Sequence, residues 1–106
     1  MFDDMISTAG SICGAAELVK EHGAREIHVA ATHGIFAGEA IPKLSAAPVD
    51  SVVVTDSVPI PEDKMIPKME ILTVAGILGE AIKRIHRHES ISAVFEGEHH
   101  PAIVAE

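Results

Sequence analysis

Short apolar segments that alternate with helical patterns most strongly constrain the fold of this 106-residue chain. The clearest segment, residues 50–55, contains Val52-Val53-Val54, and β-branched side chains favour strands. Residues 26–32 predict a short strand, in which Ile27, Val29, Ala30 and Ala31 are apolar on both faces, and residues 70–74 predict another. Helical spacing of apolar residues recurs between and after them, over 11–22, 37–44 and 74–88. The alternation predicts an α/β fold, in which a parallel sheet with right-handed crossovers is flanked by helices.

Individual residues refine the boundaries of these elements. Ser11 is a candidate N-cap of the first helix, and Gly23 is a candidate left-handed stop after it. Pro42 is compatible with a helix only in the first turn, so the helix that contains it is expected to begin just before Pro42. Residues 56–68 contain three prolines and predict a loop, and residues 97–106 show no periodicity and are expected to form a disordered tail.

Polar residues fall at the ends of the predicted strands 26–32 and 50–55 and after the short apolar start of the chain, which we interpret as the end of a further strand. They are Asp3 and Asp4, Thr32 and His33, and Thr55 and Asp56. The carboxyl ends of parallel strands share one edge of the sheet, where ligands of open α/β folds bind. We therefore expect a site at this edge, although a turn stabilised by local hydrogen bonds explains His33 equally well. His28, inside a strand, is expected to be a packed or edge histidine.

Residues 3–11 allow a functional and a purely structural interpretation. Ser7-Thr8-Ala9-Gly10-Ser11 precedes a helical pattern, so it is either an ordinary helix start or a backbone cradle for phosphate. Asp3 and Asp4 are either solvated strand-end acids or acceptors for sugar hydroxyls, and carboxylates also suit Mg²⁺. Because neighbouring strand residues point to opposite faces, we expect only one of the two acids to contact a sugar.

Composition excludes several classes of function. A net charge of −8 argues against nucleic-acid binding, which needs a basic face. The sequence contains neither a signal peptide nor a membrane-length apolar run, and its single cysteine, Cys13, fits a buried thiol in a cytoplasmic protein. His86 and His88 face different sides of a helix, so we expect no metal site built from the histidines.

Several ordered motifs resemble a known family. Phe2-Asp3-Asp4-Met5-Ile6-Ser7-Thr8-Ala9-Gly10-Ser11 resembles the phosphoribosyl-binding signature of the type I phosphoribosyltransferase fold. Four later blocks resemble, in order and spacing, the C-terminal half of the ribose-phosphate pyrophosphokinases (PRPP synthases). They are Ala31-Thr32-His33-Gly34-Ile35-Phe36, Val52-Val53-Val54-Thr55-Asp56-Ser57-Val58-Pro59, Glu80-Ala81-Ile82-Lys83-Arg84-Ile85-His86 and Glu89-Ser90-Ile91-Ser92-Ala93-Val94-Phe95. The resemblance covers residues 1–96.

The resemblance implies roles for particular residues. Ser7, Thr8, Ala9, Gly10 and Ser11 would surround the 5-phosphate of ribose 5-phosphate, and Asp3 and Asp4 would approach the ribose hydroxyls. Ser7 departs from the family pattern, which usually has Asp there, and Ser11 replaces Thr. Ser90, Ser92 and Phe95 resemble a regulatory phosphate or ADP site at a subunit interface, but an ordinary C-terminal segment explains them as well. None of the residues present matches the family's catalytic region.

The resemblance also implies a reaction and its partners. PRPP synthases use Mg²⁺ and transfer pyrophosphate from ATP to ribose 5-phosphate. They are about three times longer, and little apolar sequence precedes Asp3, so we expect a partial domain, truncated at its N-terminus. Such a chain would supply the ribose 5-phosphate site, with ATP bound through other segments, and would be inactive alone. It would form a homo-oligomer or associate with a full-length synthase. The alternatives are a non-catalytic regulatory or assembly subunit, and a phosphoribosyltransferase.

Overall fold

The computed structural model describes residues 1–96. The chain divides into two compact units, Met1–Ile71 and Leu72–Glu106, and each is described by itself. Within the described residues, no helix is both long and apolar enough to cross a membrane. The predicted tail, residues 97–106, lies outside the described residues.

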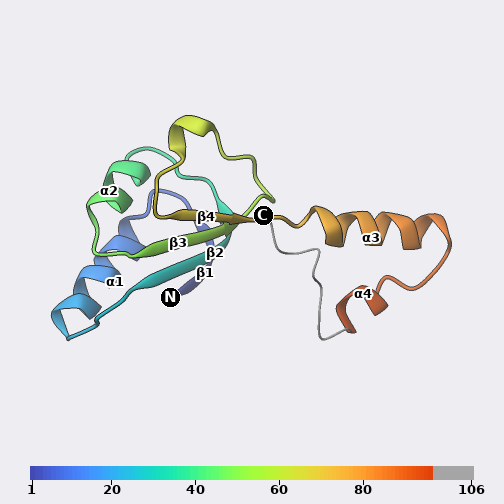
Figure 1. Ribbon diagram of the computed structural model, residues 1–106, viewed down its shortest axis with the longest axis horizontal. Coiled ribbons are helices and arrows are strands. Elements are labelled where there is room, and N and C mark those ends of the chain that lie inside the picture. The colour runs from blue at the N-terminus through green and yellow to red at the C-terminus, as the bar shows by residue number, and fades with distance from the viewer. Residues whose placement is uncertain (97–106) are drawn as a thin grey trace. The chain divides into compact units, whose positions relative to one another are not determined.

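The first unit is built on a four-stranded sheet in the order β1-β2-β3-β4 (Figure 1). The strands are β1 (Phe2–Ile6), β2 (His28–Gly34), β3 (Ser51–Thr55) and β4 (Met69–Leu72). β1 pairs with β2, and β2 with β3, in parallel. The register places Phe2 beside Ala30 and Ala30 beside Val53. The predicted α/β fold with a parallel sheet is confirmed.

Two helices connect the parallel strands, α1 (Gly10–Glu21) and α2 (Ala40–Ala46). Because the strand order follows the chain, right-handed crossovers place both helices on the same face of the sheet. The burial pattern agrees, since the buried residues of β2 and β3 alternate with more exposed ones. Between β3 and β4, the predicted loop contains one short 3-10 helix, η1 (Glu62–Lys64).

The hydrophobic core lies between the sheet and these two helices. Its largest fully buried side chains are Phe36, Ile6, Leu44, Val29, Val52 and Val54. α1 contributes Ile12, Cys13 and Ala16, which lie on one side of the helix. Burying a Val, Leu, Ile or Phe side chain contributes about 1.5–3 kcal/mol. The core therefore fixes α1, and with it the loop that precedes α1, against the sheet.

The structure confirms one predicted helix end and corrects the other. Gly23 has φ 99°, its amide bonds to the Lys20 carbonyl, and the Ala24 amide bonds to the Val19 carbonyl. This pair of bonds is the Schellman motif, which ends a helix at a left-handed residue. Ser11 is not the N-cap, because α1 begins at Gly10 and Ala9 occupies the cap position.

The prediction for Pro42 is confirmed. α2 begins at Ala40, so Pro42 lies in the first turn of that helix, where its missing N–H has no intrahelical partner to lose.

The position of Asp3 and Asp4 differs from the prediction. Both lie inside β1 instead of after a strand, because parallel pairing with β2 extends from Phe2 to Ile6. The pairing begins at the first residue, where the Met1 ammonium donates to the His28 carbonyl at 2.8 Å and the Ala30 amide donates to the Met1 carbonyl. The carboxyl end of β1 is therefore Ile6, directly before the Ser7 loop.

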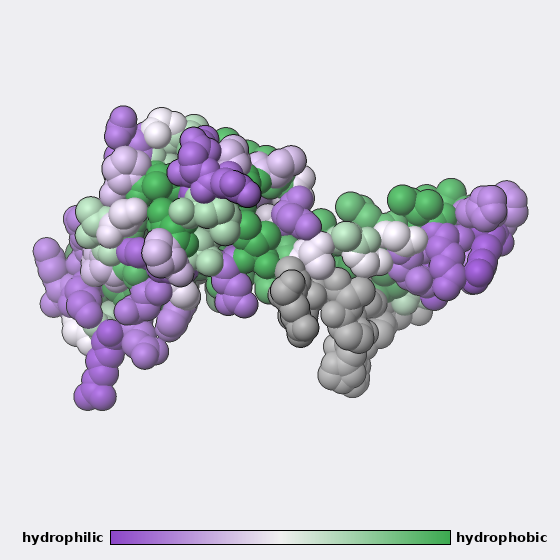
Figure 2. All heavy atoms as spheres, turned by 45° about the horizontal axis from the view of Figure 1, so that its top comes forward, coloured by the Kyte–Doolittle hydropathy of each residue, from purple (hydrophilic) through white to green (hydrophobic). Residues whose placement is uncertain are grey.

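The described part of the second unit contains α3 (Ala75–His86) and α4 (Ala93–Glu96). α3 also ends in a Schellman pattern, with His88 at φ 57° and the Glu89 amide bonded to the Arg84 carbonyl. Hydrophobic side chains gather along one side of α3 and hydrophilic ones along another (Figure 2). Three of the hydrophobic ones, Leu78, Ile82 and Ile85, are more than half exposed.

Candidate functional site

The loop between β1 and α1 leaves the start of the helix open. Ala9 has left-handed backbone angles (φ 67°, ψ 5°), and no side chain caps the helix. The first helical hydrogen bond joins the Cys13 amide to the Ala9 carbonyl at 2.9 Å. The amides of the preceding first turn have no intrahelical acceptor. Together with the helix dipole, they form a favourable environment for an anion.

Two adjoining hollows lie beside this helix start, each of about 160 Å³. The residues of the first are Asp3, Met5, Ser7, Ala9, Ser11 and Ile12. Those of the second are Met1, Phe2, Asp3, Ser11, Ile12, Ala15 and Val29. Asp3, Ser11 and Ile12 line both, so the two hollows adjoin; together they are called the groove between β1 and α1.

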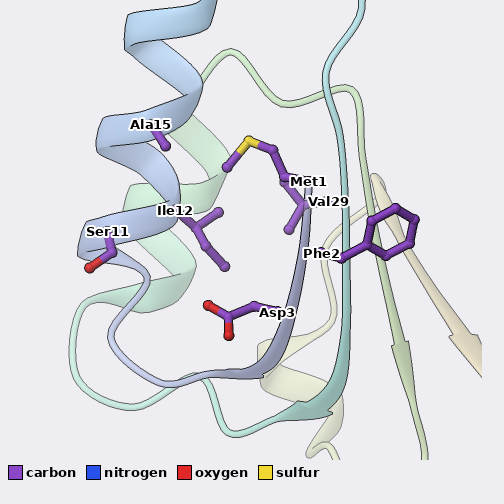
Figure 3. Close-up of a pocket in the computed structure, with 7 residues that line it drawn as sticks. All are labelled: Met1, Phe2, Asp3, Ser11, Ile12, Ala15 and Val29. Atoms are coloured by element: carbon purple, nitrogen blue, oxygen red, sulfur yellow. The ribbon is translucent and has the colours of Figure 1, made fainter.

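Side-chain directions in the groove are visible in Figure 3. The Asp3 carboxylate projects from β1 into the space in front of α1, and Ile12 extends from the helix toward the strand. The Ser11 side chain points away from the strand, while Phe2 points to the other face of the sheet. Phe2 is 93% exposed. The groove thus combines one carboxylate with a lining that is polar and apolar in similar measure.

The two neighbouring acids occupy different surroundings. Asp3 lines both hollows, and one of its carboxylate oxygens accepts the Asp4 amide at 2.8 Å. Asp4 shares the opposite face of β1 with Phe2, because side chains alternate along a strand. Of the two predicted sugar-contacting acids, Asp3 is the one that the fold brings to the groove.

The fold also brings most of the predicted phosphate loop to the groove. Ser7, Ala9 and Ser11 line its first hollow, Thr8 lies between them in the loop, and Gly10 is the first residue of α1. Their roles in substrate binding stay predictions.

A network of hydroxyl groups joins the carboxyl ends of β2 and β3. The Thr55 hydroxyl donates to the Thr32 carbonyl at 2.7 Å. The Ser57 hydroxyl lies 2.9 Å from the Thr55 hydroxyl. His33 Nδ1 lies 2.7 Å from the Ser57 hydroxyl. The expectation that these strand ends meet at one edge is confirmed. Ser57, two residues past β3, completes the network and was not among the predicted strand-end residues.

His28 is the first residue of the inner strand β2, at the opposite end of the strand from His33. Its Nδ1 lies 2.6 Å from the Ser51 hydroxyl and its Nε2 lies 3.3 Å from a Glu26 carboxylate oxygen. The side chain is 58% exposed and β2 pairs with a strand on each side, so the expectation of a packed or edge histidine is wrong.

The turn that follows β2 is bonded to the end of β1. The Ile6 carbonyl accepts the amides of Ile35 and Phe36, and the Ser7 carbonyl accepts the Ala37 amide at 2.9 Å. These bonds fix the residues from which the candidate phosphate loop departs. Sequence patterns give little sign of them, because they connect backbone groups of segments far apart in the chain.

One lysine ammonium lies beside the first turn of α1. A Cβ built on Gly10 would be 3.9 Å from Lys43 Nζ, which α2 carries in its last turn. The ammonium offers a positive charge next to the candidate anion site. This matters because the whole chain carries a net charge of −8.

The single thiol of the chain is buried under α1. Cys13 is 8% exposed, in agreement with the prediction. Burial raises the pKa of the Cys13 thiol, the Glu17 carboxylate raises it further, and Lys43 and Lys68 oppose the shift. The thiol therefore favours its neutral form, and burial keeps it away from reagents.

The residues predicted for a regulatory site lie after α3. Arg84 donates to the Ser90 carbonyl at 3.2 Å and to Glu80 Oε1 at 3.1 Å, which ties this segment to the helix. The side chains of Ser90 and Ser92 are exposed. Phe95 belongs to α4. Their regulatory role stays a prediction.

Comparison with known proteins decides the family. Residues 1–96 match a family described as the phosphoribosyl synthetase-associated domain. The chain belongs to this family. Curated relatives include a ribose-phosphate pyrophosphokinase of Rhodopirellula baltica, 60% identical over 95 residues, and one of Pasteurella multocida, 49% identical over 96 residues. Each alignment covers 90% of this chain and 30% of the relative, so the chain spans about a third of the relatives' length.

A solved structure supports the same fold for the phosphoribosyl synthetase-associated domain. The phosphoribosylpyrophosphate synthetase of Mycobacterium smegmatis aligns with a TM-score of 0.80 and 38% sequence identity. The alignment covers 82% of this chain and 29% of the synthetase. The resemblance to PRPP synthases predicted from the sequence motifs is therefore confirmed.

Proposed function

We propose that the groove between β1 and α1 binds ribose 5-phosphate. The observation that carries the proposal is the Asp3 carboxylate facing the groove beside the open start of α1. Main-chain N–H groups of the first turn would hold the phosphate, and Asp3 would accept hydrogen bonds from ribose hydroxyls. The names of the relatives support this choice of ligand.

We further propose that the chain serves a ribose-phosphate diphosphokinase. In that reaction the β,γ-pyrophosphoryl group of ATP passes to the 1-hydroxyl of ribose 5-phosphate, giving PRPP and AMP. This chain would contribute by positioning the acceptor sugar, since phosphoryl-group transfer depends on alignment and charge neutralisation. ATP would be bound by other segments or by a partner, so the chain alone would be inactive.

The groove suits Mg²⁺ only as an ion that is bound jointly by the protein and the substrate phosphate. No group of three or more His, Cys, Asp or Glu side chains within residues 1–96 could hold a metal. Mg²⁺ commonly binds through one or two carboxylates together with substrate phosphates and water. Asp3 would supply the one protein carboxylate that such an ion needs. The ion would neutralise phosphate charge when bound.

A non-catalytic subunit that associates with a full-length synthase is the second candidate. Ser7 supports it, because PRPP synthases usually have an acid at that position. The exposed Leu78, Ile82 and Ile85 of α3 also support association with another subunit, either a second copy or a full-length synthase. Both candidates place the protein in the cytoplasm, where a free thiol such as Cys13 stays reduced. A phosphoribosyltransferase, which would bind PRPP through the same loop, is a further alternative, but it would need a base-binding segment.

The ligand is tested by titrating the full chain with ribose 5-phosphate while the amide resonances of residues 3–13 are followed by NMR. We expect saturable shifts of the Ser7–Ser11 amides with ribose 5-phosphate, weaker shifts with inorganic phosphate and none with ribose. Binding that leaves these amides unchanged would contradict the proposal.

The activity is tested by measuring AMP formation from ATP and ribose 5-phosphate with Mg²⁺. We expect none from the chain alone. Turnover by the chain alone would contradict a role limited to the sugar site. Co-purification with a full-length synthase of the same cell, without a rise in activity, would favour the non-catalytic subunit.

A further inference from the structure

Three backbone hydrogen bonds join the turn after β2 to the start of the candidate phosphate loop. The Ile6 carbonyl accepts the Ile35 amide at 2.9 Å and the Phe36 amide at 3.2 Å, and the Ser7 carbonyl accepts the Ala37 amide at 2.9 Å. Ile6 is the last residue of β1 and Ser7 begins the loop. The direction in which the loop leaves β1 is therefore set by residues 35–37, which belong to the turn after β2.

The shape of this turn depends on Phe36. Its backbone has φ 53°, a left-handed conformation that bulky side chains rarely adopt, and its ring is 1% exposed. Burial of the ring offsets the backbone strain, because a different φ would move the ring out of the core. The ring therefore holds the turn in the conformation that directs the amides of residues 35–37 toward β1.

The ring in turn requires a glycine at position 34. A Cβ on Gly34 would lie 2.6 Å from Phe36 Cε2 and 2.9 Å from Cζ, both closer than real contacts allow. It would also lie 3.3 Å from a Val54 methyl group, so the added Cβ has little space to move away from the ring. Gly34 is itself buried. Gly34 and Phe36 thus act as one packed pair.

From these contacts we infer that Gly34 and Phe36 are positioning residues for the anion-binding loop, although neither contacts the groove. The packed pair fixes the conformation of the turn, and the amides of the turn bind the Ile6 and Ser7 carbonyls. These two carbonyls in turn fix the position of the loop from Ser7 to Gly10. The inference rests on the proposed function for the identity of the ligand. The structural part, the dependence of the loop on the pair, is tested independently of any ligand.

The experiment compares Gly34→Ala with Gly14→Ala in the full chain. Gly14 is an exposed residue of α1 where an added Cβ meets nothing within 4 Å, so it controls for the substitution itself. Amide hydrogen exchange is measured for residues 7–11 and 35–37, with the Leu18–Lys20 amides of α1 as an internal reference. Affinity for ribose 5-phosphate is measured on the folded protein by calorimetric titration.

We expect Gly34→Ala to speed exchange in both segments while the reference amides stay protected. We expect the affinity for ribose 5-phosphate to fall roughly tenfold, since small displacements of binding groups have large effects. The double variant Gly34→Ala/Phe36→Leu should recover part of both losses, because leucine lacks the two ring atoms that an added Cβ would contact. A merely structural role would lower stability without this local exchange and without the rescue.

The possible results separate the two proposals. If the unmodified chain fails to bind ribose 5-phosphate, the proposed function fails, and hydrogen exchange still decides the role of the pair. If Gly34→Ala folds with unchanged exchange at residues 7–11, the inference is wrong. If that variant does not fold, Phe36→Leu alone replaces it, with faster exchange at residues 7–11 and a two- to threefold loss of affinity expected. Unchanged values in that variant would equally overturn the inference.

Discussion

The ammonium group of Lys68 lies 2.7 Å from the carbonyl oxygen of Leu44. It also reaches the Ala47 carbonyl at 3.3 Å, so it binds the otherwise open carbonyl end of α2 from the neighbouring segment before β4. Lys68 thereby connects α2 to the far edge of the sheet. A lysine there also interacts favourably with the negative end of the helix dipole.

We expect Lys68→Met to lower the free energy of unfolding by about 1–2 kcal/mol. The substitution keeps most of the aliphatic stem but removes charge-assisted hydrogen bonds to partly buried carbonyls. Urea denaturation checks this value. Lys64→Met, in η1, is the matched control and should change stability by less than about 0.5 kcal/mol. Equal effects of the two substitutions would contradict the capping role.

We expect Ala9→Gly to stabilise the chain by about 0.5–1 kcal/mol. A left-handed residue with a Cβ costs about 1–2 kcal/mol, and the greater freedom of glycine in the unfolded chain offsets part of the gain. The reciprocal change, Gly23→Ala at φ 99°, should destabilise by a similar amount. Thermal unfolding of the two variants measures both effects. If Ala9→Gly were destabilising, the left-handed geometry at the start of α1 would be wrong.

We expect Asp3→Asn to weaken ribose 5-phosphate binding more than Asp4→Asn does. Asp3 faces the groove, whereas Asp4 lies on the opposite face of β1. Charged hydrogen bonds to hydroxyl groups contribute about 1.5–3 kcal/mol, so a loss of roughly ten- to a hundredfold is expected for Asp3→Asn. The affinity for inorganic phosphate should stay unchanged in both variants. Calorimetric titration with the two ligands makes the comparison, and a larger effect of Asp4→Asn would contradict the assignment.

We expect Lys43→Gln to reduce the affinity for ribose 5-phosphate roughly two- to fivefold at low salt, with a smaller effect at high salt. The ammonium lies beside the first turn of α1 but is exposed, so its contribution is modest and screened by ions. Lys20→Gln, at the other end of α1, is the control. Titrations at two ionic strengths check the prediction. A loss that does not depend on salt would argue against an electrostatic role.

We expect Cys13 to react slowly with iodoacetamide at pH 8 in the folded chain and rapidly in urea. Because burial raises the pKa of this thiol, the folded state retains its proton at a pH where the unfolded state loses it. The stabilising contribution is therefore complete below the ordinary value of 9.0 and is lost as the pH rises through the higher folded-state pKa. Denaturation of the chain and of Cys13→Ala from pH 8 to 11 measures this contribution, which should be absent from the variant.

The sequence allowed prediction wherever a local pattern determines the structure. The Val52-Val53-Val54 strand and the left-handed Gly23 follow from side-chain branching and from the freedom of glycine, and the structure contains both. The groove residues Ser7, Ala9 and Ser11 were found because they form a compact motif before a helix.

The predictions that differed concern pairing or backbone angles that leave no local pattern in the sequence. Asp3 and Asp4 were expected beyond the strand end, but pairing with β2 carries β1 through them as far as Ile6. Ser11 was expected to cap α1, but the left-handed Ala9 starts the helix one residue before Ser11. The left-handed Phe36 has no local signal, because burial of its ring in the core offsets the backbone strain.

The bonding of Met1 to β2 has a practical consequence for protein engineering. A peptide N–H in the place of the Met1 ammonium could donate the same hydrogen bond to the His28 carbonyl. A polypeptide fused ahead of Met1 would therefore leave the existing pairing of β1 with β2 intact.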